Sequence, residues 1–424
     1  KLLASGESEI RERLRSKGIA EYLFHPLSMN ALRGTVREMV RRKLGVEYLL
    51  VDTLGRGSFG VVYRAKRLSD GEVFALKEIS LRRKDKARMN EARMEPETLR
   101  SLSWPTIVRL VDFWQSHKDQ VQYLLMPVLL GGNLLQQIET SKKAESVIPS
   151  TRCLDWYAQT LHALSYLHWM GVFHRDVKPA NFFLSTDCRA LQVGDLGSAA
   201  RLEGSTSQSQ DITASEIKNW ASDVHARGST GFLNRRGRDP LGRDTCVKGA
   251  VTTVAYSSPE VFKEKVFYAS SDLWSLGVSF FQVMTLELPH ELPDTADQNP
   301  NLVDPDKLGM NAKLVLEQLE DKRSQDEKYC MPGASISAED VEKDATRTMV
   351  NELLQLLHTD PMSRPSANWL TSQAHIKHRV KRFLEMSDYP FKDCFSAPAN
   401  ECNTPVDAHL LSFERLLDES WTAE

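Results

Sequence analysis

A glycine-rich segment near residue 55 has the residue types needed to hold phosphate groups. It reads Gly55-Arg-Gly57-Ser-Phe-Gly60-Val-Val62 and lies between two apolar stretches that predict β-strands. Glycine lets the main chain approach a phosphate closely, so that backbone N–H groups can contact it. Because a strand rather than a helix follows, the pattern argues against a dinucleotide-binding fold.

A lysine ends the next apolar strand pattern, Phe74-Ala75-Leu76-Lys77. On its own it would most simply be a solvated strand end. Its position shortly after the glycine segment favours a second interpretation, in which the ammonium group pairs with the phosphates of ATP.

Two further motifs follow in order, His174-Arg175-Asp176-Val-Lys178-Pro-Ala-Asn181 and Asp195-Leu196-Gly197. With the glycine segment and Lys77, this ordered series resembles the eukaryotic protein kinase family over residues 50–380. The resemblance implies an α+β, bilobal fold. A small antiparallel β-sheet lobe with one main helix would be followed by a larger, mainly helical lobe.

The resemblance also implies roles for individual residues. Lys77 would hold the α- and β-phosphates of ATP and pair with a glutamate, for which Glu95 is the best candidate and Glu91 the alternative. Pro96 departs from the family pattern, because proline inside a helix costs about 3 kcal/mol. We therefore expect the helix either to begin near Glu95 or to be kinked.

By the same resemblance, Asp176 would accept or orient the proton of a substrate hydroxyl. Asn181 and Asp195 would hold two Mg²⁺ ions through their oxygen atoms. Lys178 is typical of serine/threonine kinases and would contact the γ-phosphate. Leu196 replaces the phenylalanine that is commoner at this position and keeps an apolar side chain there. ATP and Mg²⁺ are thus the expected cofactors.

The nucleotide site implied by the resemblance contains glycines, apolar side chains and the backbone of a hinge segment. Met126 would be the gatekeeper, and Pro127 to Leu129 the hinge. The predicted residues are Leu54, Gly55, Gly57, Gly60, Val62, Ala75, Lys77, Met126, Pro127, Leu129 and Phe183.

Other matching residues have structural rather than catalytic roles in the family. Glu260, in Ser258-Pro259-Glu260, would pair with Arg364. Asp272 would anchor the catalytic loop, and Thr253 would bond to Asp176 and Lys178.

The pattern of apolar residues divides the chain into four parts. Strands are predicted at 49–51, 61–63 and 73–76, with a turn at Asp70-Gly71, and helices at 153–170 and 271–286. The predicted parts are an N-terminal helical extension (1–44), a first lobe (45–129), a second lobe (130–380) and a C-terminal extension (381–424). The second lobe contains an activation segment (195–260) with a long insert (201–250) and a further insert (287–342).

Composition narrows the class of partner. The formal net charge is −3, which lacks the basic excess of a nucleic-acid binder. The longest apolar stretch, 123–130, is too short to span a membrane. Protein substrates and ATP are the expected partners. The N-terminal helices or the C-terminal tail could also bind a regulatory partner, although packing on the neighbouring lobe is favoured for the helices.

The cysteine pattern bears on the compartment. Six cysteines are scattered without a CxxC pair, which favours free thiols and a cytoplasmic location. The chain starts at Lys1 rather than Met, so we expect a fragment or a processed form. Secretion is therefore the alternative, and in a secreted protein Cys394 and Cys402 could form a disulfide.

An active kinase is not the only interpretation of this sequence. Loss of turnover would make the chain a pseudokinase that acts as a nucleotide-binding scaffold or allosteric partner, and a docking protein is a third interpretation.

A separate hypothesis concerns regulation. Autophosphorylation within 205–252, with Thr245 or Thr252 preferred, would give Arg175 a phosphate to bind.

The Asp195-Leu196-Gly197 motif is somewhat similar to that of NIMA-related kinases. The N-terminal helical extension, the run Asn181-Phe-Phe-Leu184 and the insert of the second lobe are somewhat similar to apicomplexan rhoptry kinases.

Overall fold

The computed structural model describes most of the chain between residues 44 and 384. The described residues are 44, 47–57, 60–81, 94–116, 120–202, 245–249, 253–293, 295–296, 299–309, 312, 315–316 and 338–384. They belong to two compact units, of which the first takes residues up to 96 together with 110–128 and the second takes 97–109 and residues from 129 onward.

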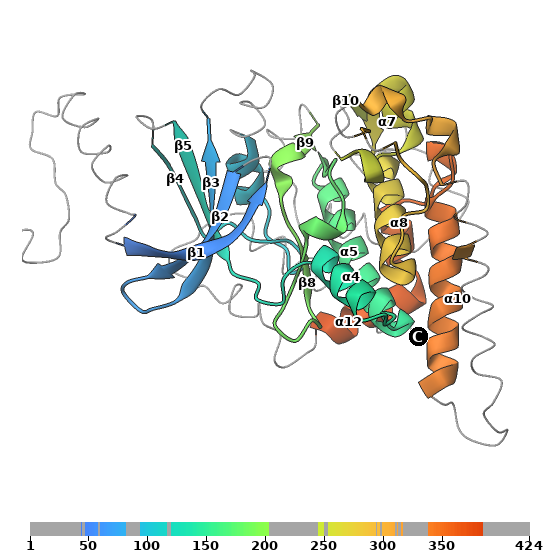
Figure 1. Cartoon of the computed structure of the whole chain (residues 1–424), viewed down its shortest axis with the longest axis horizontal. Helices are drawn as coiled ribbons and strands as arrows, with labels where there is room; N and C mark the ends of the chain where they lie inside the picture. The colour runs from blue at the N-terminus through green and yellow to red at the C-terminus, as the bar shows by residue number, and fades with distance from the viewer. Residues whose placement is uncertain are drawn as a thin grey trace, which may run out of the picture. The chain divides into compact units, whose positions relative to one another are not determined.

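The first unit is built on a five-stranded antiparallel sheet (Figure 1). Its strands lie in the order β1-β2-β3-β5-β4. The strands predicted from the sequence are confirmed, and each is longer than the apolar stretch from which it was predicted. Their bounds are β1 (Tyr48–Gly57), β2 (Gly60–Arg67), β3 (Val73–Ser80), β4 (Asp112–Ser116) and β5 (Val121–Pro127).

Aromatic side chains dominate the core of this sheet. The ring of Tyr48 stacks on Trp114 at 5.9 Å between centroids and meets Phe74 edge-on at 6.2 Å. Leu76 and Leu125 are fully buried beside them. These residues come from β1, β3, β4 and β5, so their packing ties together strands that are distant in sequence.

The predicted turn at Asp70-Gly71 is confirmed between β2 and β3. Gly71 has a φ of 80°, which glycine adopts without the strain that a β-carbon would bring. The N–H of Arg67 donates to the carbonyl oxygen of Glu72 at 2.7 Å, and the Arg67 guanidinium bonds the Asp70 carboxylate. This turn sets the register that places Val62 opposite Lys77.

Two glycines of the glycine-rich segment have opposite steric environments, which yields a prediction. A β-carbon on Gly60 would lie 1.8 Å from the backbone oxygen of Glu78, whereas one on Gly55 would meet nothing within 4 Å. We expect Gly60→Ala to push β2 away from β3 and to lower the free energy of unfolding by about 1–3 kcal/mol. Gly55→Ala is the matched control and should change it by less than about 1 kcal/mol. Urea unfolding of both variants would measure the difference, and equal midpoints would contradict this reading.

The second unit is mainly helical, and α5 lies at its centre (Figure 1). Sixteen of its residues are buried, because α8, α10, α11 and α12 all pack against it. The predicted helices at 153–170 and 271–286 are therefore confirmed as α5 and α8. The bounds are α4 (Leu134–Lys143), α5 (Ser150–Trp169), α7 (Pro259–Glu264), α8 (Ala269–Thr285), α10 (Ala338–Leu356), α11 (Ala367–Thr371) and α12 (Ala374–Leu384).

Local sequence signals set the start of α4 and the end of α5. Asn133 caps α4 by accepting from the N–H of Gln136, whose side chain accepts from the N–H of Asn133 in return, both at 3.0 Å. After α5, Gly171 adopts a φ of 70° and donates its N–H to the carbonyl oxygen of His168. The chain can therefore turn directly from α5 into β6 (Val172–Phe173).

Short strand pairs organise the loops of the second unit. They are β6 with β9 (Ala200–Arg201), β7 (Phe182–Leu184) with β8 (Leu191–Val193), and β10 (Cys246–Lys248) with β11 (Val266–Tyr268). The insert predicted over 201–250 thus overlaps the end of β9 and contains β10, and its extent stays a prediction. Short 3₁₀ turns at Pro300–Leu302 and Pro305–Lys307 lie in the second predicted insert, and α10 begins before that insert was expected to end.

Two predicted boundaries also differ from the structure. Residues 97–109 belong to the second unit, although 45–129 was predicted as one lobe. The cause is backbone pairing with β8, in which the N–H of Val108 donates to the carbonyl oxygen of Val193 at 2.9 Å. At the other end, α12 continues past the predicted boundary at residue 380 to Leu384.

Several predictions lie outside the described residues. These are the N-terminal helices within 1–43, Glu91, Thr252, the tail from residue 385 with Cys394 and Cys402, and most of the insert at 203–244. A helix with the length and apolar character required to cross a membrane does not occur among the described residues.

Candidate functional site

A β-hairpin brings together the two residues predicted to bind metal. Asn181 directly precedes β7, and Asp195 follows β8 by two residues. Because the strands pair antiparallel, with Phe182 opposite Val193, the start of one lies beside the end of the other. The N–H of Gly194 donates to the carbonyl oxygen of Asn181 at 3.0 Å. Residues fourteen positions apart in the sequence therefore meet at one end of the hairpin.

Asp272, in the first turn of α8, holds the loop that carries Asp176. Its Oδ2 accepts from the N–H of His174 and contacts Nε2 of His168, and its Oδ1 accepts from the N–H of Arg175, each at 2.9 Å. Burial alone would raise the pKa of Asp272, but the contacts with His168 and His174 together hold that pKa below its ordinary value. The predicted anchoring role of Asp272 is confirmed by these contacts.

Three side chains fix the carboxylate of Asp176. Thr253 donates its hydroxyl to Oδ1 at 2.6 Å, and Lys178 Nζ lies 2.7 Å from Oδ2. Asn181 Nδ2 donates to the backbone oxygen of Asp176 at 2.8 Å and to Oδ2 at 3.2 Å. Lys178 also donates to Thr253 Oγ1 at 2.8 Å. The carboxylate is therefore oriented before any substrate arrives, as a group that receives a proton requires.

His174 connects this loop to the segment that carries Asp195. Its Nδ1 accepts from the N–H of Asp176 at 3.3 Å, and its Nε2 lies 3.2 Å from the carbonyl oxygen of Gly194. We assign the ring proton to Nε2, because only that tautomer makes both bonds in the neutral ring. The imidazole thus links the loop of Asp176 to the segment that carries Asp195.

In the first unit, Lys77 and Glu95 form a buried ion pair. Lys77 Nζ lies 2.7 Å from Glu95 Oε1, and the side chains are 9% and 2% exposed. Residues 94–100 are helical and contain Pro96, while residues 82–93 lie outside the described part. The sequence therefore identified the right glutamate for this contact, and the start of the helix stays a prediction.

The strand register places the predicted nucleotide residues of the first unit together. Gly57 pairs with Gly60, Gly55 with Val62, and Val62 with Lys77. In the next ladder, Ala75 pairs with Met126 and Phe74 with Pro127. Leu54 is 39% exposed on β1. The two other predicted residues, Leu129 and Phe183, belong to the second unit.

The donor set at Asn181 and Asp195 suits Mg²⁺ chemically. Asn181 uses Nδ2 to bond Asp176, so its Oδ1 is the atom that would bind a cation. Asp195 supplies a carboxylate from a left-handed backbone conformation with a φ of 58°. Mg²⁺ is commonly held by one or two such oxygens together with waters and substrate phosphates. A cluster of three or more His, Cys, Asp or Glu side chains able to hold a metal does not occur among the described residues.

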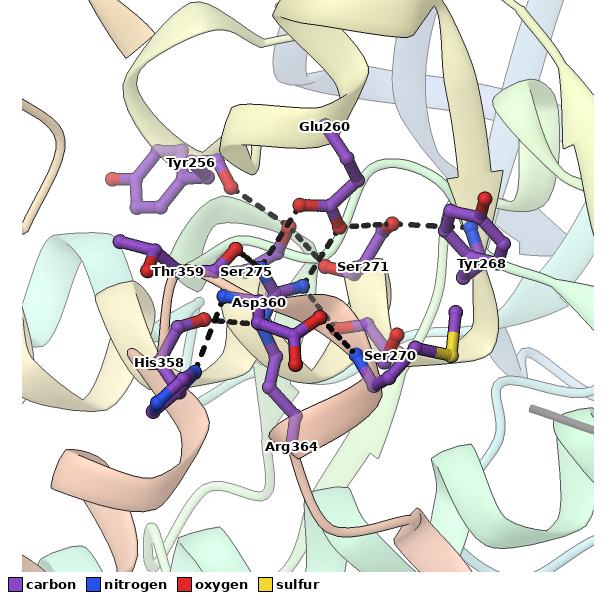
Figure 2. A network of polar contacts seen from close by, with 11 residues as sticks. Tyr256, Glu260, Tyr268, Ser270, Ser271, Ser275, His358, Thr359, Asp360 and Arg364 are labelled. Carbon is purple, nitrogen blue, oxygen red and sulfur yellow. Dashed lines mark hydrogen bonds and ion pairs between the residues drawn. The ribbon is translucent and has the colours of Figure 1, made fainter. Parts of the chain in front are cut away.

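A buried ion pair supports the segment that contributes Thr253. Arg364 donates to both oxygens of Glu260, at 2.7 and 2.9 Å, and Ser271 donates to Oε1 at 2.6 Å (Figure 2). The three other N–H groups of Arg364 donate to the carbonyl oxygens of His358, Ser270 and Thr359. Burial would raise the pKa of Glu260, but the Arg364 contacts keep it below its ordinary value. The predicted Glu260–Arg364 pair is confirmed.

Arg175 lies against the end of the activation segment. Its guanidinium carbon is 4.9 Å from the centre of the Phe267 ring, and a β-carbon on Gly249 would come within 2.5 Å of its Nη2. The β10–β11 pair therefore covers this arginine.

Sequence analysis identified Arg175 but missed Phe267, Gly249 and His168. No motif marks these three positions, because their contacts arise only when distant segments pack together.

Two buried histidines make the stability of the second unit depend on pH. Burial lowers the pKa of His162 to about 3 and that of His290 to about 4, from 6.5. His290 Nε2 bonds the carbonyl oxygen of Ala255 at 3.1 Å. Between pH 6.5 and 4 the unfolded chain binds protons at these positions that the folded chain does not. The contribution of these two histidines to the free energy of unfolding is therefore fully present above pH 6.5 and declines as the pH falls.

We expect the free energy of unfolding to drop by about 2 kcal/mol per histidine between pH 8 and pH 5. Replacing His290 with glutamine keeps a donor for Ala255 but removes the titrating group, so the drop should roughly halve. Urea unfolding at pH 8, 6 and 5 measures both curves. Identical pH dependence in the two proteins would show that His290 does not contribute to the loss of stability at low pH.

Comparison with known proteins supplies independent information. A family model described as a protein kinase domain matches residues 48–220 and 234–376. The chain is 26% identical over 342 residues to the serine/threonine-protein kinase Nek4 of Mus musculus, an alignment that covers 80% of this chain and 34% of that protein. It is also 26% identical over 338 residues to Nek1 of Mus musculus, covering 80% of this chain and 22% of that protein.

A plant relative is more similar over a shorter region. The chain is 31% identical over 259 residues to CBL-interacting protein kinase 4 of Oryza sativa subsp. japonica, which covers 59% of this chain and 47% of that protein. The chain thus spans between about a fifth and about half of the length of these relatives.

Proposed function

This chain belongs to the protein kinase family and has its bilobal α+β fold, and we propose that it transfers the γ-phosphoryl group of ATP to serine or threonine hydroxyls of proteins. The observation that carries the proposal is the fixed carboxylate of Asp176, bonded by Thr253 and Lys178. The similarity to Nek4 and Nek1 supports the serine/threonine class and the resemblance to NIMA-related kinases. The resemblance to rhoptry kinases stays a prediction.

In the proposed reaction, a substrate hydroxyl oxygen forms a bond to the γ-phosphorus while the bond to the β–γ bridging oxygen breaks and ADP leaves. The hydroxyl proton passes to a carboxylate oxygen of Asp176. Thr253 and Lys178 hold that carboxylate in place, so little reorganisation is needed at the moment of transfer. Lys178 also offsets negative charge on the group that moves.

The remaining residues position the nucleotide. Lys77, held by Glu95, would contact the α- and β-phosphates, and the glycine-rich segment would bring backbone N–H groups to the phosphates. Asn181 Oδ1 and the Asp195 carboxylate would hold Mg²⁺, which neutralises charge on the phosphates when bound. These roles follow from the family resemblance and from the chemistry of each side chain.

The experiment that tests this function measures transfer of label from γ-labelled ATP to a generic protein substrate. We expect Mg²⁺-dependent label on serine or threonine with the wild type and its loss with Asp195→Asn. Nucleotide binding is measured in parallel by calorimetry. Binding without transfer in the wild type, with or without a prior incubation in ATP, would overturn the proposal and favour a pseudokinase.

The intact set of Lys77, Asp176, Asn181 and Asp195 favours the enzyme over that alternative, because a pseudokinase usually lacks one of them. Protein substrates and a regulatory partner on the N-terminal or C-terminal extension belong to the same proposal. A cytoplasmic location rests on the scattered cysteines, of which Cys153, Cys188 and Cys246 are free thiols.

We further propose that phosphorylation within 205–252 regulates this site. Thr245 is half-buried and directly precedes β10, whose neighbour Gly249 packs on Arg175. A phosphate near β10 would lie close to the positive charge of Arg175. Mapping of phosphosites on active protein tests the idea, and an active preparation without phosphate in this segment would exclude it.

A further inference from the structure

The last described helix, α12, is strongly basic, and its basic side chains range from partly buried to exposed. It carries four lysine or arginine residues and no acidic residue in eleven positions. Its apolar side chains Ile376, Val380 and Phe383 are buried, since α12 packs on α5 and α11. The basic residues therefore occupy the remaining arc of the helix, which we call the α12 basic face: Lys377, Arg379, Lys381 and Arg382.

Neighbouring carboxylates offset only part of this charge. Asp155 on α5 bonds Arg379 at 2.5 Å and Arg382 at 2.8 and 2.9 Å, so one carboxylate serves two guanidinium groups. Arg152, one turn before Asp155, donates to the neutral carbonyl oxygen of Cys188. Within the described part of the chain, Lys377 forms no ion pair with a carboxylate.

A second carboxylate beside α12, that of Glu352, is directed into the core. Glu352 of α10 is 6% exposed, accepts a hydrogen bond from Tyr157 at 3.3 Å and lies 3.3 Å from His375 Nε2. Glu352 therefore does not neutralise Lys377. The α12 basic face thus keeps an excess of positive charge toward solvent, which favours an acidic occupant.

The sequence that follows α12 has the complementary charge. Residues 385–424 contain nine acidic and two basic residues, a formal charge of −7, whereas residues 1–384 carry +4. Within this segment, the leucines between Leu410 and Leu417 predict an amphipathic helix with Glu414, Asp418 and Glu419. The segment lies outside the described residues, and its first residue directly follows the end of α12.

From this charge complementarity and this connection, we propose that the acidic segment 385–424 binds in cis to the α12 basic face. A random coil of this length would have a root-mean-square span of about 35 Å, enough to fold back over an eleven-residue helix. Tethering raises the local concentration of the segment to about the millimolar range, so ion pairs that are individually weak suffice for occupancy. An acidic surface of a partner protein would have to displace this segment first.

Zero-length carbodiimide cross-linking of the full chain tests the contact. We expect Lys377 and Lys381 to link to carboxylates of 385–424 within monomers at about 0.02 M salt, and the links to disappear at about 0.5 M salt. The pair Lys142–Glu287, 2.6 Å apart, is an internal control for the reaction. Links that form only between two copies, or equally to lysines across the surface, would overturn the proposal.

Hydrogen exchange of the charge-reversed chain provides the second measurement. We expect Lys377→Glu/Lys381→Glu to speed amide exchange in residues 405–420 by about tenfold, because bound segments exchange through opening. Lys142→Glu/Lys143→Glu reverses the same charges on α4 and should leave that exchange unchanged. Thermal unfolding checks that both variants fold. Equal exchange in the two variants would mean that the segment does not rest on α12.

Discussion

Replacing Asp176 with asparagine should lower the rate constant for phosphoryl transfer by about two to four orders of magnitude. Asparagine has nearly the same shape but cannot take the proton of the attacking hydroxyl. The side-chain oxygen of the asparagine can still accept from Thr253, whose hydroxyl donates to Asp176 Oδ1 at 2.6 Å in the wild type. Its amide nitrogen would instead face Lys178, whose ammonium group lies 2.7 Å from Oδ2. The defect should therefore appear in kcat, with little change in the binding of ATP.

Initial rates at saturating ATP and calorimetric binding of ATP measure the two quantities separately. Asp187→Asn is the matched control, because Asp187 also pairs with a cation, Arg189, but lies on the surface of the β7–β8 loop. That variant should retain wild-type kcat. Loss of activity in Asp176→Asn together with loss of ATP binding would point to misfolding rather than to a missing base.

Replacing Arg364 with alanine should destabilise the second unit by about 3–5 kcal/mol. The guanidinium is fully buried and supplies two hydrogen bonds to Glu260, which is 5% exposed. Without Arg364 the carboxylate would stay buried with uncharged serine donors such as Ser271, and three backbone carbonyl oxygens would lose their donors. The cost therefore comes mainly from the groups left behind.

A double-mutant cycle separates this penalty from simple loss of packing. Glu260→Gln removes the buried charge, so Arg364→Ala in that background should cost clearly less than in the wild type. Urea unfolding of the four proteins gives the coupling energy. Equal costs in the two backgrounds would show that Arg364 acts through packing, including its contact with the Trp274 ring at 5.0 Å, rather than through Glu260.

The residues of the candidate site were recognisable from the sequence because their types and their order along the chain match the motifs of the protein kinase family. Lys77, Asp176, Asn181 and Asp195 supply an ammonium group, carboxylates and an amide that few other residues can replace. Glu95 was also identified, and the ion pair with Lys77 is present at 2.7 Å. Strands and helices with clear periodicity, such as β1 to β3, α5 and α8, were predicted from that periodicity.

Features without a local signal could not be predicted in this way. The role of residues 97–109 in the second unit depends on pairing with β8, about 85 residues later. The strand β10 lies at the end of a segment poor in large apolar residues, and its pairing with β11 overrides that composition. The contact between Arg175 and Phe267 joins residues more than ninety positions apart.

The sequence by itself thus determined the family, the order of the motifs and the chemical identity of the site. The folded structure was needed to show that Asn181 also bonds Asp176, that His168 joins Asp272 beneath its loop, and that α12 presents a basic face. The physical reason is that side-chain chemistry and periodicity are local properties of the chain. Orientation, burial and the pairing of charges depend on segments that become neighbours only when the chain folds.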